Sequence, residues 1–389
     1  MLVTYTTKFL NHASFYFENE SEIIVVDPWF FGKIFDNSWS LLQETSDKDI
    51  TISKIKHIFI THEHPDHLHW GTLKFISDQS SESIKVYFTQ RQNKNVRDNL
   101  TKLGFHVVEI PPHSRQKLNG NFYYTQFPFG HDSAFVFEVD NKVHFNQNDC
   151  YLDNYNCAMI SAFFPQIDYW WMQFSLAGYY ANRDDIDGLQ AAKDFHIQAF
   201  EKYYKIFKPT KAIPFASHVY FCKKYNSYLN EWAVSIEELR DACPEINMCV
   251  PFYGDLIDEC DNDESIKKWN HLTTMKHQDI DEPLKVSDDK IMTPLNQWLK
   301  GARNNLPYDK IVLNFFDDNR NLVLDFDDKK CFFTNDVHKI AGTLTREGLL
   351  CFAKFPWGAD TLNITSCFDV QDSTAWKFLL QYKDSSYVR

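Results

Sequence analysis

A polar segment with three imidazoles and two carboxylates lies near the start of this 389-residue chain. Residues 62–67 read His-Glu-His-Pro-Asp-His and directly follow the β-branched and aromatic run Lys56–Thr61. A loop at a strand end can turn adjacent and alternate side chains toward one point. Imidazole nitrogens and carboxylate oxygens are preferred ligands of zinc and also suit iron. Because packing gives no reason to concentrate such groups, the segment favours a metal site over a solvated polar loop.

Similar residues follow three later strand-like runs. Each is explained equally well by a turn aspartate or a hydrogen-bonded histidine. Taken together, their positions suggest that four strand ends converge on one edge of a sheet. The three pairs are His131-Asp132 after Phe122–Phe127, Asn148-Asp149 after Lys142–Asn146, and Ser217-His218 after Lys211–Phe215.

Short apolar runs and turn signals predict the elements that would position these residues. Asp184–Phe207 is expected to form a helix, because its apolar residues recur on one face and Pro209 follows it. Glu231–Cys243 is expected to form a second helix. The mixed order of strands and helices predicts layered sheets flanked by helices, an α/β (α+β) fold. Further expected strands are Phe15–Glu18, Ile23–Val26, Val86–Thr89, His106–Ile110 and Ala134–Val139.

Composition changes in the last third of the chain. Residues from about 254 to 289 are acidic and polar, which indicates a surface connection. We therefore expect a catalytic domain over residues 1–250, an acidic connection over 251–290 and a small α+β appendage over 291–389. Within the appendage, the strand-like runs are Ile311–Asp327, Lys330–Thr334, Leu349–Phe355 and Thr361–Val370.

Charge and cysteine usage exclude several classes of protein. The 40 basic and 53 acidic residues give a net charge of −13, which disfavours binding to nucleic acid. The nine cysteines form no C-x-x-C pair, so we expect reduced thiols and a cytoplasmic protein. No secretion signal is expected at the N-terminus, and no apolar stretch is long enough to span a membrane. Aromatic residues make up 16% of the chain, an unusually high share.

The pattern H-x-H-x-D-H with a later His, Asp and His resembles the metallo-β-lactamase superfamily. The resemblance covers about residues 1–250 and implies a four-layer αββα sandwich with two divalent ions at the sheet edge. By this resemblance His62, His64 and His131 would hold one ion, and Asp66, His67 and His218 the other. Asp149 would bridge both. These ligands do not distinguish zinc from iron, and manganese also fits.

A second resemblance is narrower. Asn11-His12-Ala13-Ser14 followed by Asp27-Pro28-Trp29-Phe30 is similar to the branch with ascorbate-phosphate lactonases. The string from Asp27 through Trp39 to Glu44, with the later Trp357-Gly358-Ala359-Asp360, resembles the catalytic part of CMP-N-acetylneuraminate hydroxylase. That family carries a Rieske iron–sulfur domain with Cys-His pairs. This sequence contains no C-x-H or C-x-x-H, so we expect no Rieske cluster within it.

Three functions follow from these residues. The first is a hydrolase acting on an ester, lactone or phosphodiester of a small sugar- or nucleotide-like substrate, with Asp66 moving a proton and His12 near the ions. The second is a non-haem diiron oxygenase of a sugar or nucleotide-sugar, which would need a separate reductase. The third is a non-catalytic binding protein. Trp29, Trp39 and Tyr180 are candidate walls of a substrate pocket, with core packing as the alternative.

Overall fold

The first sheet has six strands in the order β1-β2-β3-β6-β7-β8. The computed structural model describes residues 4–46, 49–90, 93–336 and 339–385. Strands β1, β2 and β3 pair antiparallel, whereas β3, β6, β7 and β8 run parallel. The strands are β1 (Thr6–Asn11), β2 (Ser14–Glu18), β3 (Ile23–Val26), β6 (Ile55–Phe59), β7 (Lys85–Thr89) and β8 (His106–Ile110).

The second sheet also has six strands, in the order β14-β13-β12-β11-β10-β9. It contains an antiparallel meander of β10, β11 and β12, with Asp140 and Asn141 in left-handed backbone at the β11–β12 turn. The strands are β9 (Gln116–Asn119), β10 (Phe122–Phe129), β11 (Asp132–Val139), β12 (Lys142–Asn148), β13 (Tyr169–Gln173) and β14 (Lys211–Phe215).

Alternation along the strands separates two layers of core. Phe15 and Phe17 of β2 lie between the two sheets, while Tyr16 lies on the outer face of the first sheet. Phe15 stacks on Trp171 of β13, with ring centroids 4.3 Å apart. Much of the high aromatic content is therefore packed between the sheets.

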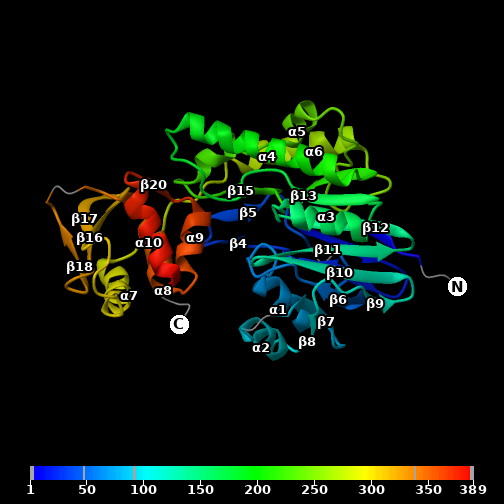
Figure 1. The fold of residues 1–389 in the computed structure, drawn as a ribbon, viewed down its shortest axis with the longest axis horizontal. Coiled ribbons are helices and arrows are strands. Elements are labelled where there is room, and N and C mark those ends of the chain that lie inside the picture. The colour runs from blue at the N-terminus through cyan, green and yellow to red at the C-terminus, as the bar shows by residue number, and fades with distance from the viewer. Residues whose placement is uncertain (1–3, 47–48, 91–92, 337–338, 386–389) are drawn as a thin grey trace.

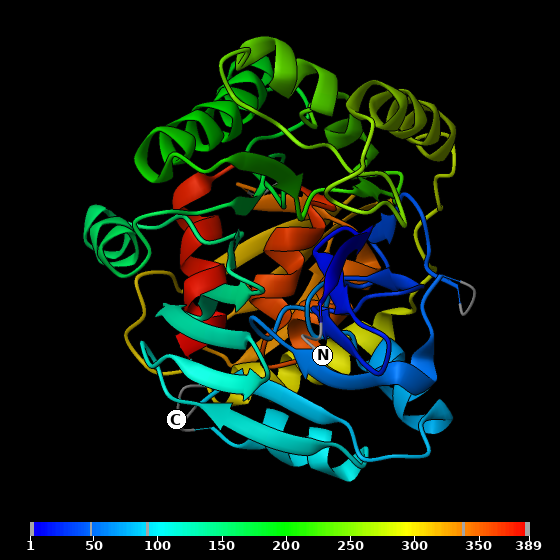
Figure 2. The same ribbon diagram turned by 90° about the vertical axis from the view of Figure 1, so that its right-hand side faces the viewer.

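Helices cover the outer faces of both sheets, and Figure 2 shows them above and below the strands. The arrangement confirms the predicted four-layer αββα sandwich. The first sheet is covered by α1 (Trp70–Gln79) and α2 (Asn95–Lys102), and the second by α3 (Asn154–Phe163), α4 (Ile186–Phe207) and α5 (Ile236–Ala242).

The predicted bounds agree better with the structure for α4 than for α5. Helix α4 begins within two residues of the predicted start, because the Asp185 side chain caps its first turn. The prediction for α5 was wrong at its beginning. Residues Ser227–Glu231 form a 3-10 turn (η2), and a capping box between Ser235 and Glu238 starts α5 only at Ile236.

A small third sheet lies beside the sandwich, in the order β15-β5-β4. Trp29 and Trp39 belong to the apolar cluster beneath it, together with Phe221. Ile364 of the C-terminal part packs against the same cluster. The remaining short elements here are β4 (Lys33–Ile34), β5 (Trp39–Leu41), β15 (Val219–Phe221) and the 3-10 turn η1 (Ile52–Lys54).

Residues 288–385, called here the C-terminal unit, have a separate apolar core. The unit is the predicted small α+β appendage, and Figure 1 shows it beside the sandwich. Its sheet has the order β18-β17-β16-β19-β20. Its elements are α7 (Asp288–Lys300), β16 (Lys310–Phe315), β17 (Asp318–Asp325), β18 (Lys330–Thr334), β19 (Gly342–Leu344), α8 (Arg346–Lys354), α9 (Gly358–Thr365), β20 (Phe368–Val370) and α10 (Ser373–Ser385).

Two strand predictions in this unit were wrong. All of Leu349–Phe355 except its last residue lies in α8, whose first turn is capped by the Thr345 side chain. Most of the run Thr361–Val370 is divided between α9 and β20. Short apolar runs occur in buried helices as well as in strands, so periodicity alone did not distinguish them.

The acidic segment before the C-terminal unit contains a further helix, α6 (Asn262–Lys276). Its Trp269 is buried against Phe9 and stacks on His218, with centroids 4.1 Å apart. The segment thus packs on the sandwich, and the division into domains stays a prediction. None of the described helices is long and apolar enough to cross a bilayer.

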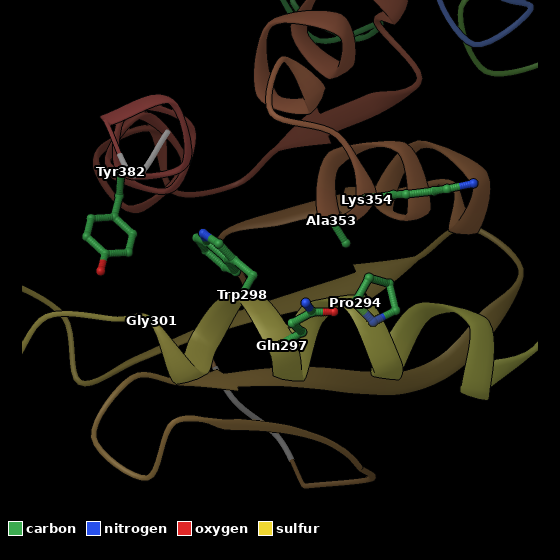
Figure 3. A pocket seen from close by; sticks show the side chains of 7 residues that line it. All are labelled: Pro294, Gln297, Trp298, Gly301, Ala353, Lys354 and Tyr382. Carbon is green, nitrogen blue, oxygen red and sulfur yellow. The ribbon is translucent and has the colours of Figure 1, made fainter. Parts of the chain in front are cut away.

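A pocket of about 380 Å³ lies within the C-terminal unit (Figure 3). Its lining includes Trp298, Lys354 and Tyr382. None of the lining residues is a predicted ligand of a metal ion.

Candidate metal centre

The ends of five strands supply the residues of the candidate site. His12 follows β1, Asp27 follows β3, residues 61–67 follow β6, Asp149 follows β12 and His218 follows β14. Several of these turns require left-handed backbone at residues other than glycine, with φ of 42° at Asp27, 63° at Asn148 and 52° at Ala216. Such conformations are costly for L-residues and cluster at functional sites.

One candidate ligand group, called here the inner group, consists of His12, Asp66 and His67. Their ligand atoms lie within 4.8 Å of one another, and all three residues are buried. The Oδ2 atom of Asp66 is 3.2 Å from His12 Nε2 and 3.2 Å from His67 Nε2. The structure therefore brings the predicted catalytic pair together and adds His67 to it.

Asp27 contacts His67 at the ring nitrogen that is turned away from the inner group. Its Oδ2 is 2.9 Å from His67 Nδ1, and both side chains are fully buried. Asp27 also accepts hydrogen bonds from the backbone nitrogen and hydroxyl of Thr61, at 2.8 and 2.7 Å. A carboxylate on one ring nitrogen fixes the orientation of a histidine and leaves the other nitrogen for a metal ion.

A second group, called here the outer group, consists of His62, His64 and Asp149. His62 Nε2 is 2.9 Å from His64 Nδ1 and 3.4 Å from Asp149 Oδ2. The same oxygen of Asp149 is 3.8 Å from His67 Nε2 of the inner group. Asp149 therefore lies between the two groups, where a bridging ligand was predicted.

His131 and Asp132 differ in their placement. His131 lies in the exposed turn between β10 and β11, and it belongs to none of the candidate ligand groups among the described residues. Its neighbour Asp132 groups with Asp149 and Cys150, and its Oδ1 is 3.8 Å from His62 Nε2. Burial and the nearby Asp149 raise the pKa of Asp132 to about 6.

His218 lies at the edge of the site in an aromatic cage. Its ring stacks on Trp269 and meets Phe9 edge-on, with centroids 5.2 Å apart. It is not part of either group, although the backbone nitrogen of Ala216 in its loop donates to the carbonyl of His12. Burial and the neighbouring His12 lower the pKa of His218 to about 3.

Buried polar atoms without hydrogen-bond partners gather at this site. Nearly all buried polar groups in proteins have partners, so such a cluster indicates a missing ligand. Lone pairs of carboxylate and neutral imidazole are the donors that a divalent cation requires. The residues therefore fit metal ions. The atoms are His12 Nδ1, Asp66 Oδ1, His67 Nε2, Asp149 Oδ1 and His218 Nε2.

The electrostatics of the inner group also suit a cation. Burial raises the pKa of Asp66, but His67 and His12 outweigh this effect and hold it well below the usual value. Burial lowers the pKa of His12, which is therefore neutral near pH 7. For His67, burial lowers the pKa, and the surrounding carboxylates outweigh it and raise the pKa.

The predicted pocket walls lie mostly in the core. Trp29 and Trp39 are 0% and 2% exposed, and Trp29 meets the His12 ring edge-on. Tyr180 is 39% exposed, and its hydroxyl lies 2.8 Å from Nε2 of His196. Trp29 therefore supports His12 from the core side.

Sequence reasoning missed three acidic residues at the site. Asp27 was noted only within the strings of the second resemblance, and Asp132 only as the neighbour of a histidine. The third, Asp360 of α9, has its Oδ2 3.5 Å from His64 Nε2. A carboxylate at a strand end was a usable signal for Asp27, whereas Asp360 was noted only within the string Trp357–Asp360 and without a role at the site.

Comparisons with known proteins agree with this geometry. Residues 23–148 match the sequence profile of the beta-lactamase superfamily domain. A segment of 103 residues, 26% of this chain, is 34% identical to cytidine monophosphate-N-acetylneuraminic acid hydroxylase from Cricetulus griseus and covers 18% of it. The same enzyme from Mus musculus is 38% identical over 80 residues, which cover 20% of this chain and 14% of the relative. The matches thus span less than a fifth of these relatives.

Among solved structures, CmlA, a diiron β-hydroxylase from Streptomyces venezuelae, is 13% identical to this chain with a TM-score of 0.43. That alignment covers 73% of this chain and 53% of CmlA.

Proposed function

We propose that the chain is a hydrolase dependent on two metal ions, because residues 23–148 match the beta-lactamase superfamily domain. Its substrate would be an ester, lactone or phosphodiester of a small sugar- or nucleotide-like molecule. One observation carries this proposal: unpartnered buried ligand atoms occur in both the inner and the outer group, and Asp149 lies between them.

The outer group would hold one ion, and Asp66 with His67 would hold the other. His218 and His131 stay candidate ligands, with His12 and Asp132 nearer to the two groups. Two bound divalent ions supply Lewis acidity to the substrate and acidify water at neutral pH.

His12 and Asp66 divide the work of proton transfer in this proposal. The low pKa of Asp66 makes it a weak base, which favours a ligand role. Asp66 orients His12 through the 3.2 Å contact to Nε2. Since burial keeps His12 neutral, its Nδ1 can accept a proton from water and return it to the leaving group.

A second candidate function is a diiron oxygenase. Each group pairs two imidazoles with one carboxylate, a combination typical of non-haem iron sites. The relatives named above are hydroxylases of a nucleotide-sugar, which supports this class of substrate for either reaction. An oxygenase would need electrons from a separate reductase.

Three further expectations belong to the same proposal. The partner is a small molecule rather than nucleic acid, as supported by the net charge of −13. The protein acts in the cytoplasm, as supported by nine cysteines that are all free thiols. No membrane attachment is expected.

Metal analysis of protein purified without added metal tests the proposal. We expect two ions per chain, with zinc in a hydrolase and iron in an oxygenase. Hydrolysis of bis-p-nitrophenyl phosphate, p-nitrophenyl acetate and a simple lactone, measured beside dioxygen uptake with a reductant, separates the two reactions. Asp149→Ala should lose both ions and all turnover, while the surface control Asp78→Ala should keep them. Wild-type protein that binds no metal would overturn the proposal, and full loading without any turnover would favour a binding protein.

A further inference from the structure

One contact joins the candidate metal centre to a distant part of the chain. Asp360 lies in the first turn of α9, in the C-terminal unit, and its Oδ2 is 3.5 Å from His64 Nε2. The exposed fractions are 55% for the Asp360 side chain and 36% for that of His64. The pair therefore lies at the open side of the site.

The two nitrogens of His64 face different groups. Its Nδ1 is 2.9 Å from His62 Nε2, on the side of the outer group. Its Nε2 faces Asp360. An ion held by the outer group would therefore take Nδ1 and leave Nε2 as the donor to Asp360. This arrangement matches the one at His67, where Asp27 contacts the nitrogen turned away from the inner group.

Close packing fixes the position of Asp360 within the C-terminal unit. Gly358 begins α9 where an added Cβ would lie 2.4 Å from the carbonyl oxygen of Cys351. The backbone of α9 therefore packs directly on α8, with no room for a side chain. Helix α9 cannot shift away from α8 without loss of this contact.

Buried polar contacts then fix the C-terminal unit to the sandwich side. Lys223 and Glu347 form an ion pair of 3.1 Å with side-chain exposures of 4% and 7%. The amide of Asn226 donates to the carbonyls of Ser38 and Thr365, at 3.0 and 2.9 Å. Figure 1 shows α9 beside β4 and β5, at the junction of the two parts. The position of Asp360 thus depends on the docked unit.

We propose that Asp360 is a positioning residue that orients His64 for the metal ion of the outer group, so that the C-terminal unit completes the metal site. The inference rests on the proposed function, since it requires that the outer group binds an ion. In this inference the C-terminal unit provides the carboxylate that orients His64, and the described residues of the sandwich provide none at that nitrogen.

The test is the affinity for each of the two ions in the full-length chain, measured with zinc by competition against a chromophoric chelator. Asp360→Asn should weaken one of the two binding steps by about 10- to 100-fold and leave the other within about twofold. Asp360→Glu, which keeps the carboxylate, should restore part of the lost affinity. A purely structural role would not weaken one ion selectively.

Asp328→Asn is the matched control, because Asp328 is 62% exposed, lies in the same unit and pairs with Lys330. It should bind both ions like the wild type. Equal affinities in Asp360→Asn and the control would overturn the inference and leave the proposed function intact. A wild-type chain without any bound zinc would overturn both. Equal weakening of both steps, or an unfolded Asp360→Asn chain beside a folded Asp328→Asn chain, would also count against it.

Discussion

Two histidines of the candidate ligand groups, His67 and His64, are each supported by a carboxylate, in very different surroundings. Asp27 and His67 are both fully buried, lie 2.9 Å apart and follow neighbouring strands of the same sheet, β3 and β6. Asp360 and His64 are partly exposed, lie 3.5 Å apart and come from separate parts of the molecule. A carboxylate that contacts an imidazole nitrogen therefore occurs once in the buried core and once at the interface between the sandwich and the C-terminal unit.

This difference in burial predicts different effects of the two carboxylates on stability and on metal binding. A buried carboxylate–imidazole pair forms only with the sandwich itself, so its loss damages both stability and metal binding. An exposed pair contributes little to stability, because water and salt screen it. It can still set the orientation of a ligand. Asp27 is thus part of the buried core, whereas Asp360 would orient one ligand of the proposed outer ion.

The largest effect is expected from Asp27→Asn. The substitution removes a buried charge that accepts hydrogen bonds from Thr61 and holds His67. The free energy of unfolding should fall by about 3–5 kcal/mol, as measured by urea denaturation of metal-free protein. One ion should be lost as well. Asp360→Asn is the comparison variant and should lose no more than about 1 kcal/mol. Equal losses in the free energy of unfolding would mean that the buried and the exposed carboxylate contribute equally to stability, which would contradict the comparison.

A smaller effect is expected from Gly358→Ala. The new Cβ would collide with backbone atoms of Cys351 and Phe352, so α9 must move. Overpacking of this kind costs about 1–3 kcal/mol, and the shift of Asp360 should weaken the same zinc-binding step as Asp360→Asn. Gly301→Ala is the control, because its added Cβ meets nothing closer than 3.4 Å. If Gly358→Ala lost stability but bound both ions normally, the link between α9 and the outer group would be wrong.

The smallest effect concerns the C-terminal unit alone. Burial lowers the pKa of Lys383 from 10.5 to about 8, and its Nζ donates to the carbonyl of Ala353. The folded state disfavours the charged amine, so this penalty is full below about pH 8 and disappears as the pH rises toward 10.5. Wild-type stability should therefore rise across this range relative to Lys383→Met. Thermal unfolding at a series of pH values checks this, and parallel curves for the two proteins would contradict it.

Local sequence predicted most strands of the sandwich and a cluster of candidate ligands, and the family resemblance implied its four layers. The segment His62–His67 concentrates ligands after a strand, and the structure places its histidines and Asp66 in the two groups. Alternating apolar residues predicted most strands of both sheets, because successive side chains of a strand point to opposite faces of its sheet. The strong cap at Asp185 and the one-sided apolar pattern made α4 predictable as well.

The features that the sequence did not predict depend on tertiary packing. Asp360 reaches His64 only because the C-terminal unit docks on the sandwich, and no periodicity encodes that docking. At the β10–β11 turn, Asp132 Oδ1 lies 3.8 Å from His62 Nε2, and turn residues alone do not predict which of two neighbours reaches the site. The apolar run in α8 fitted two elements equally, since burial on all sides removes the pattern that separates helix from strand.

The left-handed turns at Asp27, Asn148 and Ala216 have a consequence for how the molecule tolerates change. Glycine would adopt these conformations more easily, and each non-glycine residue there costs about 1 kcal/mol. The aromatic core offsets that cost. At Asp27 and Asn148 the buried hydrogen bonds to Thr61 outweigh that relief, so only glycine at Ala216 would relax its turn and raise stability. Engineering for heat resistance alone would therefore select a change in the loop that presents His218, a candidate ligand.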